Sequence, residues 1–181
     1  MPRPRLRKLG KFEATWAHMD GFVPVIFAGV LHLEDGPTPE VLQAALTEMQ
    51  RRNLALRVAL ERQGKAIYFV ADDDAALPLT TRPRDGDTGW RAEVEAHLNT
   101  PFDTDHAALF RVSYLLGEGR SEMVFSFHHS IVDNRSGLVF VDDLLTVCDQ
   151  ISSGQAIDDA AEKPLLPPME TLYPGSVSGR R

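Results

Sequence analysis

Residues 125–137 read Phe-Ser-Phe-His-His-Ser-Ile-Val-Asp-Asn-Arg-Ser-Gly. The apolar, aromatic residues that lead into it are typical of a buried strand, which ends at His128 and His129. Asp133 follows four residues after the second histidine, and another apolar segment begins after Gly137. The pattern predicts a strand that passes through a turn into a helix. A histidine held at the end of a buried strand is a candidate proton-transfer base.

The two histidines are not equivalent. Successive side chains of a strand point to opposite faces, so only one of them can face a given cleft. His129 is nearer the strand end, where substrate can reach it, and a neutral imidazole can accept a proton there. Ser136 and the start of the following helix could supply hydrogen-bond donors near the same cleft. Asp133 can organise the turn, and a buried carboxylate needs a positive partner, for which Arg57 and Arg111 are the candidates.

The bare pattern leaves other interpretations open. The two histidines could do no more than cap a strand-to-helix turn. A metal site made of His128, His129 and Asp133 is disfavoured because adjacent strand residues diverge, and His97 and His106 are distant in the chain.

Nucleophilic catalysis is also disfavoured by sequence context. Ser130 and Ser136 lack the Gly-x-Ser-x-Gly context of a nucleophilic serine. Cys148 falls on the apolar stripe of a predicted helix, which argues against a thiol mechanism.

Composition sets broader limits. The chain has 181 residues, 43% of them hydrophobic and 25% charged, which is typical of one globular domain. A net charge of −7 disfavours nucleic-acid binding, and the basic residues within 1–8 are expected to be a solvated terminus. No apolar run approaches a membrane span, and we expect no signal peptide. Because Cys148 is the single cysteine, no intrachain disulfide can form, and we expect a cytoplasmic protein.

The order of elements predicts an α+β fold, an α/β sandwich. Residues 154–181 contain four prolines and no periodicity, so we predict a lobe at 1–153 followed by a linker or tail. The periodicity predicts helices at about 11–19, 39–52, 88–98 and 136–151, and strands at about 22–33, 56–61, 66–71, 77–82, 110–116 and 122–129.

The stretch from His128 to Asn134 resembles the His-His-x-x-x-Asp-Gly signature of the condensation-domain and chloramphenicol-acetyltransferase-like acyltransferases. Its continuation, residues 135–137, is similar to the branch of alcohol acyltransferases and polyketide-associated, mycobacterial lipid acyltransferases. The resemblance spans about residues 5–174. Other segments are similar to the family in the same order: Arg-Asn-Leu-Ala-Leu-Arg at 52–57, Pro-Phe-Asp at 101–103, Leu-Phe-Arg at 109–111 and the proline-rich connection at 165–174.

This resemblance implies a fold and a reaction. The chain would be a first lobe, with a mixed, mostly antiparallel sheet covered by helices. His129 would be the general base that deprotonates a hydroxyl or amine as it attacks an acyl thioester, with His128 beside it in the catalytic motif. Asp133 would be structural and paired with an arginine, Arg57 first and Arg111 second. The thioester would be acyl-CoA or an acyl carrier protein, so neither a separate cofactor nor a metal is expected.

The chain departs from the family pattern in two ways. Asn134 replaces the glycine, and asparagine tolerates positive φ, so the turn is expected to keep its shape with a side chain at the mouth of the site. Ser136 and Gly137 are the neighbouring candidates for substrate binding. Single-chain family members carry two lobes, and chloramphenicol acetyltransferase builds its sites between subunits, so activity is expected to need a C-terminal lobe or self-association. The alternative function is a non-catalytic lobe that binds a carrier protein or an acyl chain.

Overall fold

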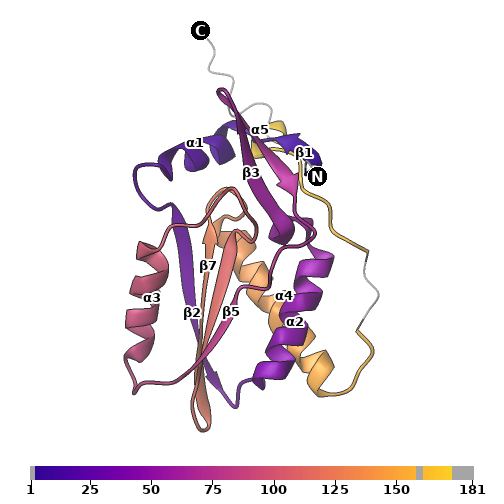
Figure 1. Ribbon diagram of the computed structural model, residues 1–181. Helices are drawn as coiled ribbons and strands as arrows, with labels where there is room; N and C mark the ends of the chain where they lie inside the picture. The colour runs from indigo at the N-terminus through magenta and orange to yellow at the C-terminus, as the bar shows by residue number, and fades with distance from the viewer. Residues whose placement is uncertain (1–2, 158–160, 173–181) are drawn as a thin grey trace.

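The chain alternates helices with strands, as its periodicity predicts (Figure 1). The computed structural model of the protein describes residues 3–157 and 161–172. The strands are β1 (Arg5–Lys8), β2 (Ile26–Glu34), β3 (Val58–Gln63), β4 (Ala66–Ala71), β5 (Leu79–Pro83), β6 (Phe110–Leu116) and β7 (Arg120–His128). The helices are α1 (Lys11–Met19), α2 (Pro39–Arg52), α3 (Gly89–Asn99), α4 (Asn134–Ser152) and α5 (Met169–Leu172), with a 3₁₀ turn, η1, at Leu54–Arg57.

The larger sheet has the strand order β2-β7-β6-β5, and the smaller has the order β1-β4-β3. β7 pairs antiparallel with β2 and with β6, whereas β5 joins β6 in parallel. Figure 1 shows α3 on one side of the larger sheet and α2 and α4 on the other. The mainly antiparallel sheets with helices on their faces confirm the predicted α+β class.

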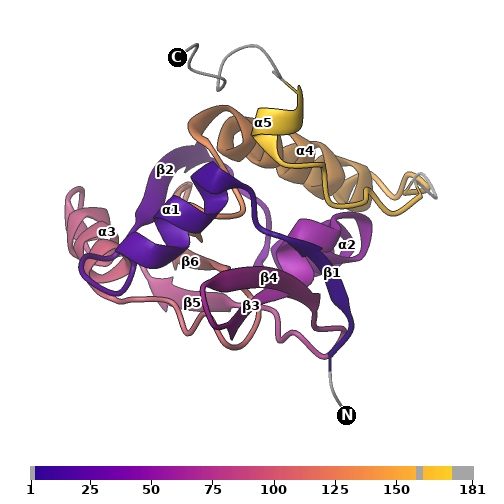
Figure 2. The same ribbon diagram turned by 90° about the horizontal axis from the view of Figure 1, so that it is seen from above.

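Two hydrophobic cores hold these layers together. In the first, aromatic residues of β6 and β7, such as Phe110 and Phe127, pack against Leu46 of α2 and Leu144 of α4. Figure 2 shows α1 and the smaller sheet from above. The second core joins residues of these elements and includes Phe69. β7 pairs with β2 and with β6, and helices cover both of its faces. The position of its C-terminal end is therefore fixed by the packing of the larger sheet and its helices.

Several element boundaries differ from the prediction by two residues or more, and two of them lie near the histidines. The strand expected from Phe22 begins only at Ile26, because Pro24 cannot donate to a ladder and Phe22 is 90% exposed. The helix expected from Ser136 begins at Asn134, because the Asp133 side chain accepts a hydrogen bond at its N-terminus.

Part of the predicted linker contacts the lobe. Lys163 forms an isolated parallel bridge with Asn53, and its backbone N–H donates to the Arg52 carbonyl at 2.6 Å. Leu165 packs against the second core, and a Glu170 carboxylate accepts the Lys11 N–H at the start of α1. Residues 158–160 and 173–181 of the predicted linker lie outside the described residues.

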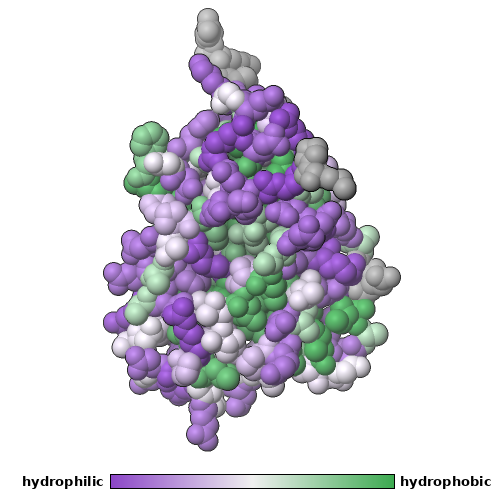
Figure 3. All heavy atoms as spheres, in the orientation of Figure 1, coloured by the Kyte–Doolittle hydropathy of each residue, from purple (hydrophilic) through white to green (hydrophobic). Residues whose placement is uncertain are grey.

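The surface carries apolar side chains among polar ones, and on the face seen in Figure 3 they form separate patches. Phe22, Leu138 and Val139 are exposed. Within residues 3–157 and 161–172, no helix has both the length and the apolar character needed to cross a membrane.

Candidate active site

The end of β7 places the histidine pair. The backbone N–H of His128 donates to the Leu109 carbonyl at 2.9 Å, on the β6 side. The N–H of His129 donates to the Val25 carbonyl at 3.0 Å, on the β2 side. The chain then leaves the sheet and turns into α4. The two histidine backbones are therefore anchored to opposite neighbours, which fixes where each imidazole can lie.

His128 is fully buried. Its Nδ1 accepts the Ser130 backbone N–H at 3.1 Å, and the Ser130 hydroxyl lies 2.7 Å from the same nitrogen. Because Nδ1 is an acceptor, the neutral ring carries its proton on Nε2, which lies 3.6 Å from an Asp20 carboxylate oxygen. Burial lowers the pKa of His128, although the Asp20 charge opposes that shift. An imidazole enclosed in this way supports the turn but cannot reach a substrate directly.

His129 is only partly buried, and its two ring nitrogens differ in environment. Nδ1 lies 2.9 Å from the Val132 carbonyl oxygen. A carbonyl can only accept, so Nδ1 carries the proton and the Nε2 lone pair is left available. Within the part of the chain that the structure describes, no hydrogen bond occupies Nε2. An imidazole in this tautomer is prepared to accept a proton.

One side of the His129 ring is covered by Trp16 from α1. The ring centroids lie 4.8 Å apart and the planes are inclined by 14°, which is a stacked arrangement. The predicted site does not include Trp16. Its helical spacing from Phe12 and Met19 is visible in the sequence, but that spacing indicates a helix face and does not show which neighbour the face meets.

Asp133 is the N-cap of α4, and its pairing differs from the prediction. Its carboxylate accepts the Ser136 backbone N–H at 2.7 Å, and hydrogen bonding to Ser136 lowers its pKa. The expected ion pair with Arg57 or Arg111 is wrong. Asp133 is exposed at a helix N-terminus, where free N–H groups and the helix dipole stabilise a carboxylate without a cation.

Arg57 and Arg111 support other parts of the lobe. The Arg57 guanidinium pairs with Asp73 at 2.6 Å and with Glu162 at 2.7 Å. Arg111 lies over the Phe102 ring at 4.0 Å and donates to the Thr100 carbonyl at 2.8 Å.

The three predicted substrate-binding residues lie in the first turn of α4. Asn134 is helical and exposed, so this position does not use the tolerance of asparagine for positive φ. Ser136 uses its backbone N–H to bind Asp133. Gly137 is buried, and a Cβ at this position would lie 2.6 Å from the Phe27 ring. Gly137 therefore allows α4 to approach β2 closely, whereas contact of Asn134 and Ser136 with substrate stays a prediction.

Of the candidate nucleophiles, Ser136 is exposed, whereas Ser130 and Cys148 are enclosed. Ser130 is 4% exposed and bonded to His128. Cys148 is buried on α4, and burial raises the pKa of its thiol to about 11. A thiol with so high a pKa holds almost no thiolate at neutral pH.

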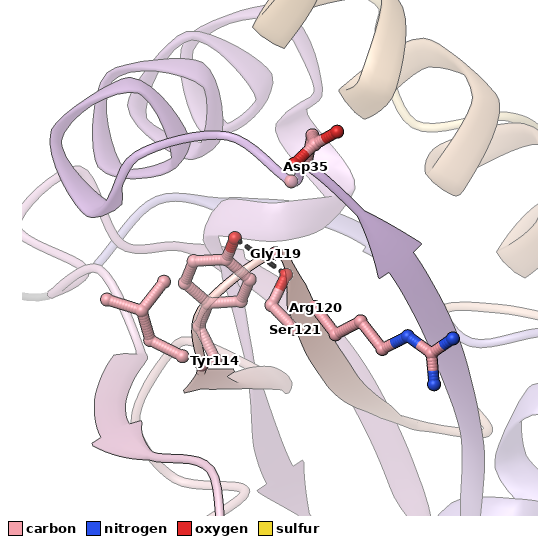
Figure 4. Close-up of a pocket in the computed structure, with 8 residues that line it drawn as sticks. Asp35, Tyr114, Gly119, Arg120 and Ser121 are labelled. Atoms are coloured by element: carbon pink, nitrogen blue, oxygen red, sulfur yellow. Dashed lines mark hydrogen bonds between the residues drawn. The ribbon is translucent and has the colours of Figure 1, made fainter.

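The two pockets described on the larger sheet do not include His128 or His129. A pocket of about 260 Å³ lies beside Asp35, Tyr114 and Ser121 (Figure 4). Ser121 is at the start of β7, whereas His129 follows its end. A wider depression of about 670 Å³ runs past His32 on the neighbouring surface. His129 lines neither of these two pockets.

Comparison with known proteins gives a consistent family assignment. Residues 25–166 match the family model described as condensation domain. The chain is 31% identical over 120 residues to a probable alcohol acetyltransferase, crmB, of Aspergillus fumigatus, covering 60% of this chain and 26% of that protein. It is 30% identical over 128 residues to a linear gramicidin synthase of Brevibacillus parabrevis, covering 67% of this chain and 2% of that protein.

Solved structures share the fold. Polyketide synthase associated protein 5 from Mycobacterium tuberculosis superposes with a TM-score of 0.73 at 21% identity, over 96% of this chain and 40% of that one. The X-domain from teicoplanin biosynthesis superposes with a TM-score of 0.76 at 20% identity, over 97% of this chain and 40% of that one. A mutant starter condensation domain of rhizomide synthetase RzmA was crystallised with C8-CoA. It superposes with a TM-score of 0.76 at 15% identity, over 84% of this chain and 38% of that one. The chain thus spans about two fifths of each of these structures.

Proposed function

Because this chain belongs to the condensation domain family, we propose that it is an acyltransferase lobe in which His129 is the general base. The acceptor is a hydroxyl or an amine, and the donor is an acyl thioester of CoA or of a carrier protein. The observation that carries the proposal is the bond between His129 Nδ1 and the Val132 carbonyl, since it leaves the Nε2 lone pair free to accept a proton.

The reaction balances with His129 as the only proton carrier. Nε2 takes the acceptor proton while the acceptor oxygen or nitrogen bonds to the thioester carbonyl carbon. When the tetrahedral intermediate collapses, the carbon–sulfur bond breaks, and the imidazolium returns the proton to the thiolate. The products are an ester or amide and a free thiol, and no separate cofactor takes part.

Two relatives support this choice of chemistry. One is named as a probable alcohol acetyltransferase, and a structural neighbour was crystallised with an acyl-CoA. In the proposal, His128 holds the turn and Asp133 caps α4, while the remaining walls of the cleft come from a C-terminal lobe or a second copy.

The test is acyl transfer by the full protein carrying His129→Ala, followed through release of free thiol from acyl-CoA with alcohols and amines as acceptors. General-base catalysis contributes typically about 10²- to 10⁴-fold, so kcat should fall by that factor. His106→Ala is the matched control, because His106 is an exposed histidine beside Asp103. Near-normal transfer by His129→Ala would refute the role of the base.

A non-catalytic lobe that binds a carrier protein or acyl chain is the second candidate. It is favoured by the position of His129 outside both pockets described above. In that case the unmodified protein would bind an acylated carrier but release no thiol with any acceptor, and His129→Ala would bind it equally well.

A further inference from the structure

Helix α1 brings two side chains, one turn apart, against the histidine pair. Trp16 stacks on the His129 ring at 4.8 Å. Asp20, at the C-cap of the same helix, lies 3.6 Å from Nε2 of His128. Residues four apart share a helix face, so a single orientation of α1 satisfies both contacts.

Asp20, which lies beside His128, also holds the loop between α1 and β2. An Asp20 carboxylate oxygen accepts the Val25 backbone N–H at 3.3 Å. The carbonyl of Val25 in turn accepts the His129 N–H at 3.0 Å. The backbone of His129 is therefore tied to the end of the helix that supplies Trp16.

The ring of His129 needs a further constraint. It lies beyond the last residue of β7, in a turn, and its one described hydrogen bond, to Val132, leaves the ring free to tilt about that bond. A flat neighbour with an inclination of only 14° restricts this tilt. Aromatic contacts of this kind favour one ring orientation by severalfold.

Trp16 does not behave as an ordinary core residue. Its neighbour Ala17, not Trp16, is the buried residue of α1. Among the described residues, the indole N–H of Trp16 makes no hydrogen bond, whereas a tryptophan buried in a core usually finds a partner. The contact that characterises its side chain is the one with His129.

We propose that Trp16 is a positioning residue for acyl transfer: its stacked indole keeps the His129 ring in the orientation that directs Nε2 to the acceptor. This inference rests on the proposed function. Trp16 itself takes no part in proton transfer, so it should act on kcat and leave the KM for the thioester nearly unchanged.

The experiment compares Trp16→Phe, Trp16→Leu and Trp16→Ala in the full protein by steady-state kinetics. Loss of the stacked ring should lower kcat by about tenfold in the Leu and Ala variants, since small misplacements of a reacting group reduce rates strongly. The KM for acyl-CoA should stay within about twofold. Trp16→Phe keeps a stacking face without the indole N–H and should recover most of kcat.

A spectroscopic readout reports the ring directly. In protein labelled with ¹⁵N-histidine, the His129 nitrogens should show the Nδ1–H tautomer in the unmodified protein and in Trp16→Phe, and mixed tautomers in Trp16→Leu. The matched control is Trp90→Ala, which removes the other tryptophan of the chain and its edge-on contact with His32. It should leave both kcat and the His129 signals unchanged.

The possible outcomes separate this inference from the proposed function. If His129→Ala is inactive while Trp16→Leu matches Trp16→Phe in kcat, the positioning role is overturned and the base assignment stands. A rise in KM at constant kcat overturns it too, because it would make Trp16 a binding wall. Should Trp16→Ala fail to fold, the comparison of Phe with Leu decides, since both fill the site and only Phe stacks.

Discussion

His97 is buried between α3 and the larger sheet, on the face of β7 opposite to the aromatic core. Its Nε2 lies 2.9 Å from the Ser113 hydroxyl, which donates to Glu93 at 2.6 Å. Its Nδ1 lies 3.0 Å from the hydroxyl of Ser126. Ser113 thus accepts from Nε2–H and Ser126 donates to Nδ1, so the neutral ring is fully satisfied. Burial lowers the pKa of His97 to about 4.

This low pKa predicts acid sensitivity. Below pH 6.5 His97 is protonated in the unfolded chain, whereas in the folded protein it stays neutral down to about pH 4. The free energy of unfolding therefore decreases as the pH falls from 6.5 to 4. At 1.36 kcal/mol per unit, the loss from this residue reaches roughly 3 kcal/mol. Urea unfolding at pH 7 and pH 4.5 should therefore show a smaller difference between the two pH values for His97→Gln than for the unmodified protein.

The matched control is His18→Gln, at an exposed position of α1, which should keep the full difference. An unchanged pH dependence in His97→Gln would mean that the buried ring is not the titrating group.

Helix α4 is the element that connects packing to the site. Its N-cap residue, Asp133, directly follows Val132, whose carbonyl binds His129. Its first turn approaches β2 at Gly137, where a Cβ would lie 2.6 Å from the Phe27 ring. A shift of α4 away from β2 would therefore move the acceptor of the His129 Nδ1 proton.

Gly137→Ala should destabilise the protein despite improving helix propensity. Overpacking costs about 1–3 kcal/mol, and the 2.6 Å approach to Phe27 favours the upper part of that range. The propensity gain of about 1 kcal/mol offsets only part of this cost. We expect a net loss of about 1–2 kcal/mol in urea unfolding, together with a reduced kcat. Leu138→Ala, at the next and exposed position, is the control for stability and should stay within about 0.5 kcal/mol. Equal stability of both variants would show that Phe27 yields without strain.

At the scale of the element, local sequence signals predict the start of a helix where they are strong. The helix predicted at about 39–52 starts where expected, because Pro39 stands in its first turn and the Thr38 hydroxyl accepts the Val41 N–H. The start of α4 differs from its prediction by two residues, because Asp133 has the sequence context of an ion-paired acid as well as that of a cap. In both cases a side chain satisfies free helix N–H groups, but only the first has an unambiguous sequence context.

At the scale of the whole molecule, residues 161–172 pack against the rest of the lobe. Leu54 donates to the Lys163 carbonyl at 3.2 Å, and Lys163 Nζ pairs with Asp143 of α4 at 2.9 Å. Leu165 adds apolar contact to the second core. These contacts join η1, α4 and the smaller sheet through residues that the sequence assigns to a linker.

Truncation tests whether this segment is part of the lobe. A chain ending at residue 157 should melt about 5–10 °C below one ending at residue 172, because backbone hydrogen bonds of about 1 kcal/mol each and the burial of Leu165 are lost. Differential scanning calorimetry gives the comparison. Identical melting temperatures would support the predicted boundary at residue 153.

The sequence by itself determined the elements, the fold class and the motif, because hydrophobic periodicity and the order of short signatures are local properties of the chain. It also distinguished His129 from His128, since side chains alternate along a strand. Only the tertiary structure decided the long-range partners: Trp16 on His129, Asp20 beside His128, and Asp73 and Glu162 on Arg57. These contacts join segments whose sequences carry no signal of one another, and the first two arise only when α1 packs against the end of β7.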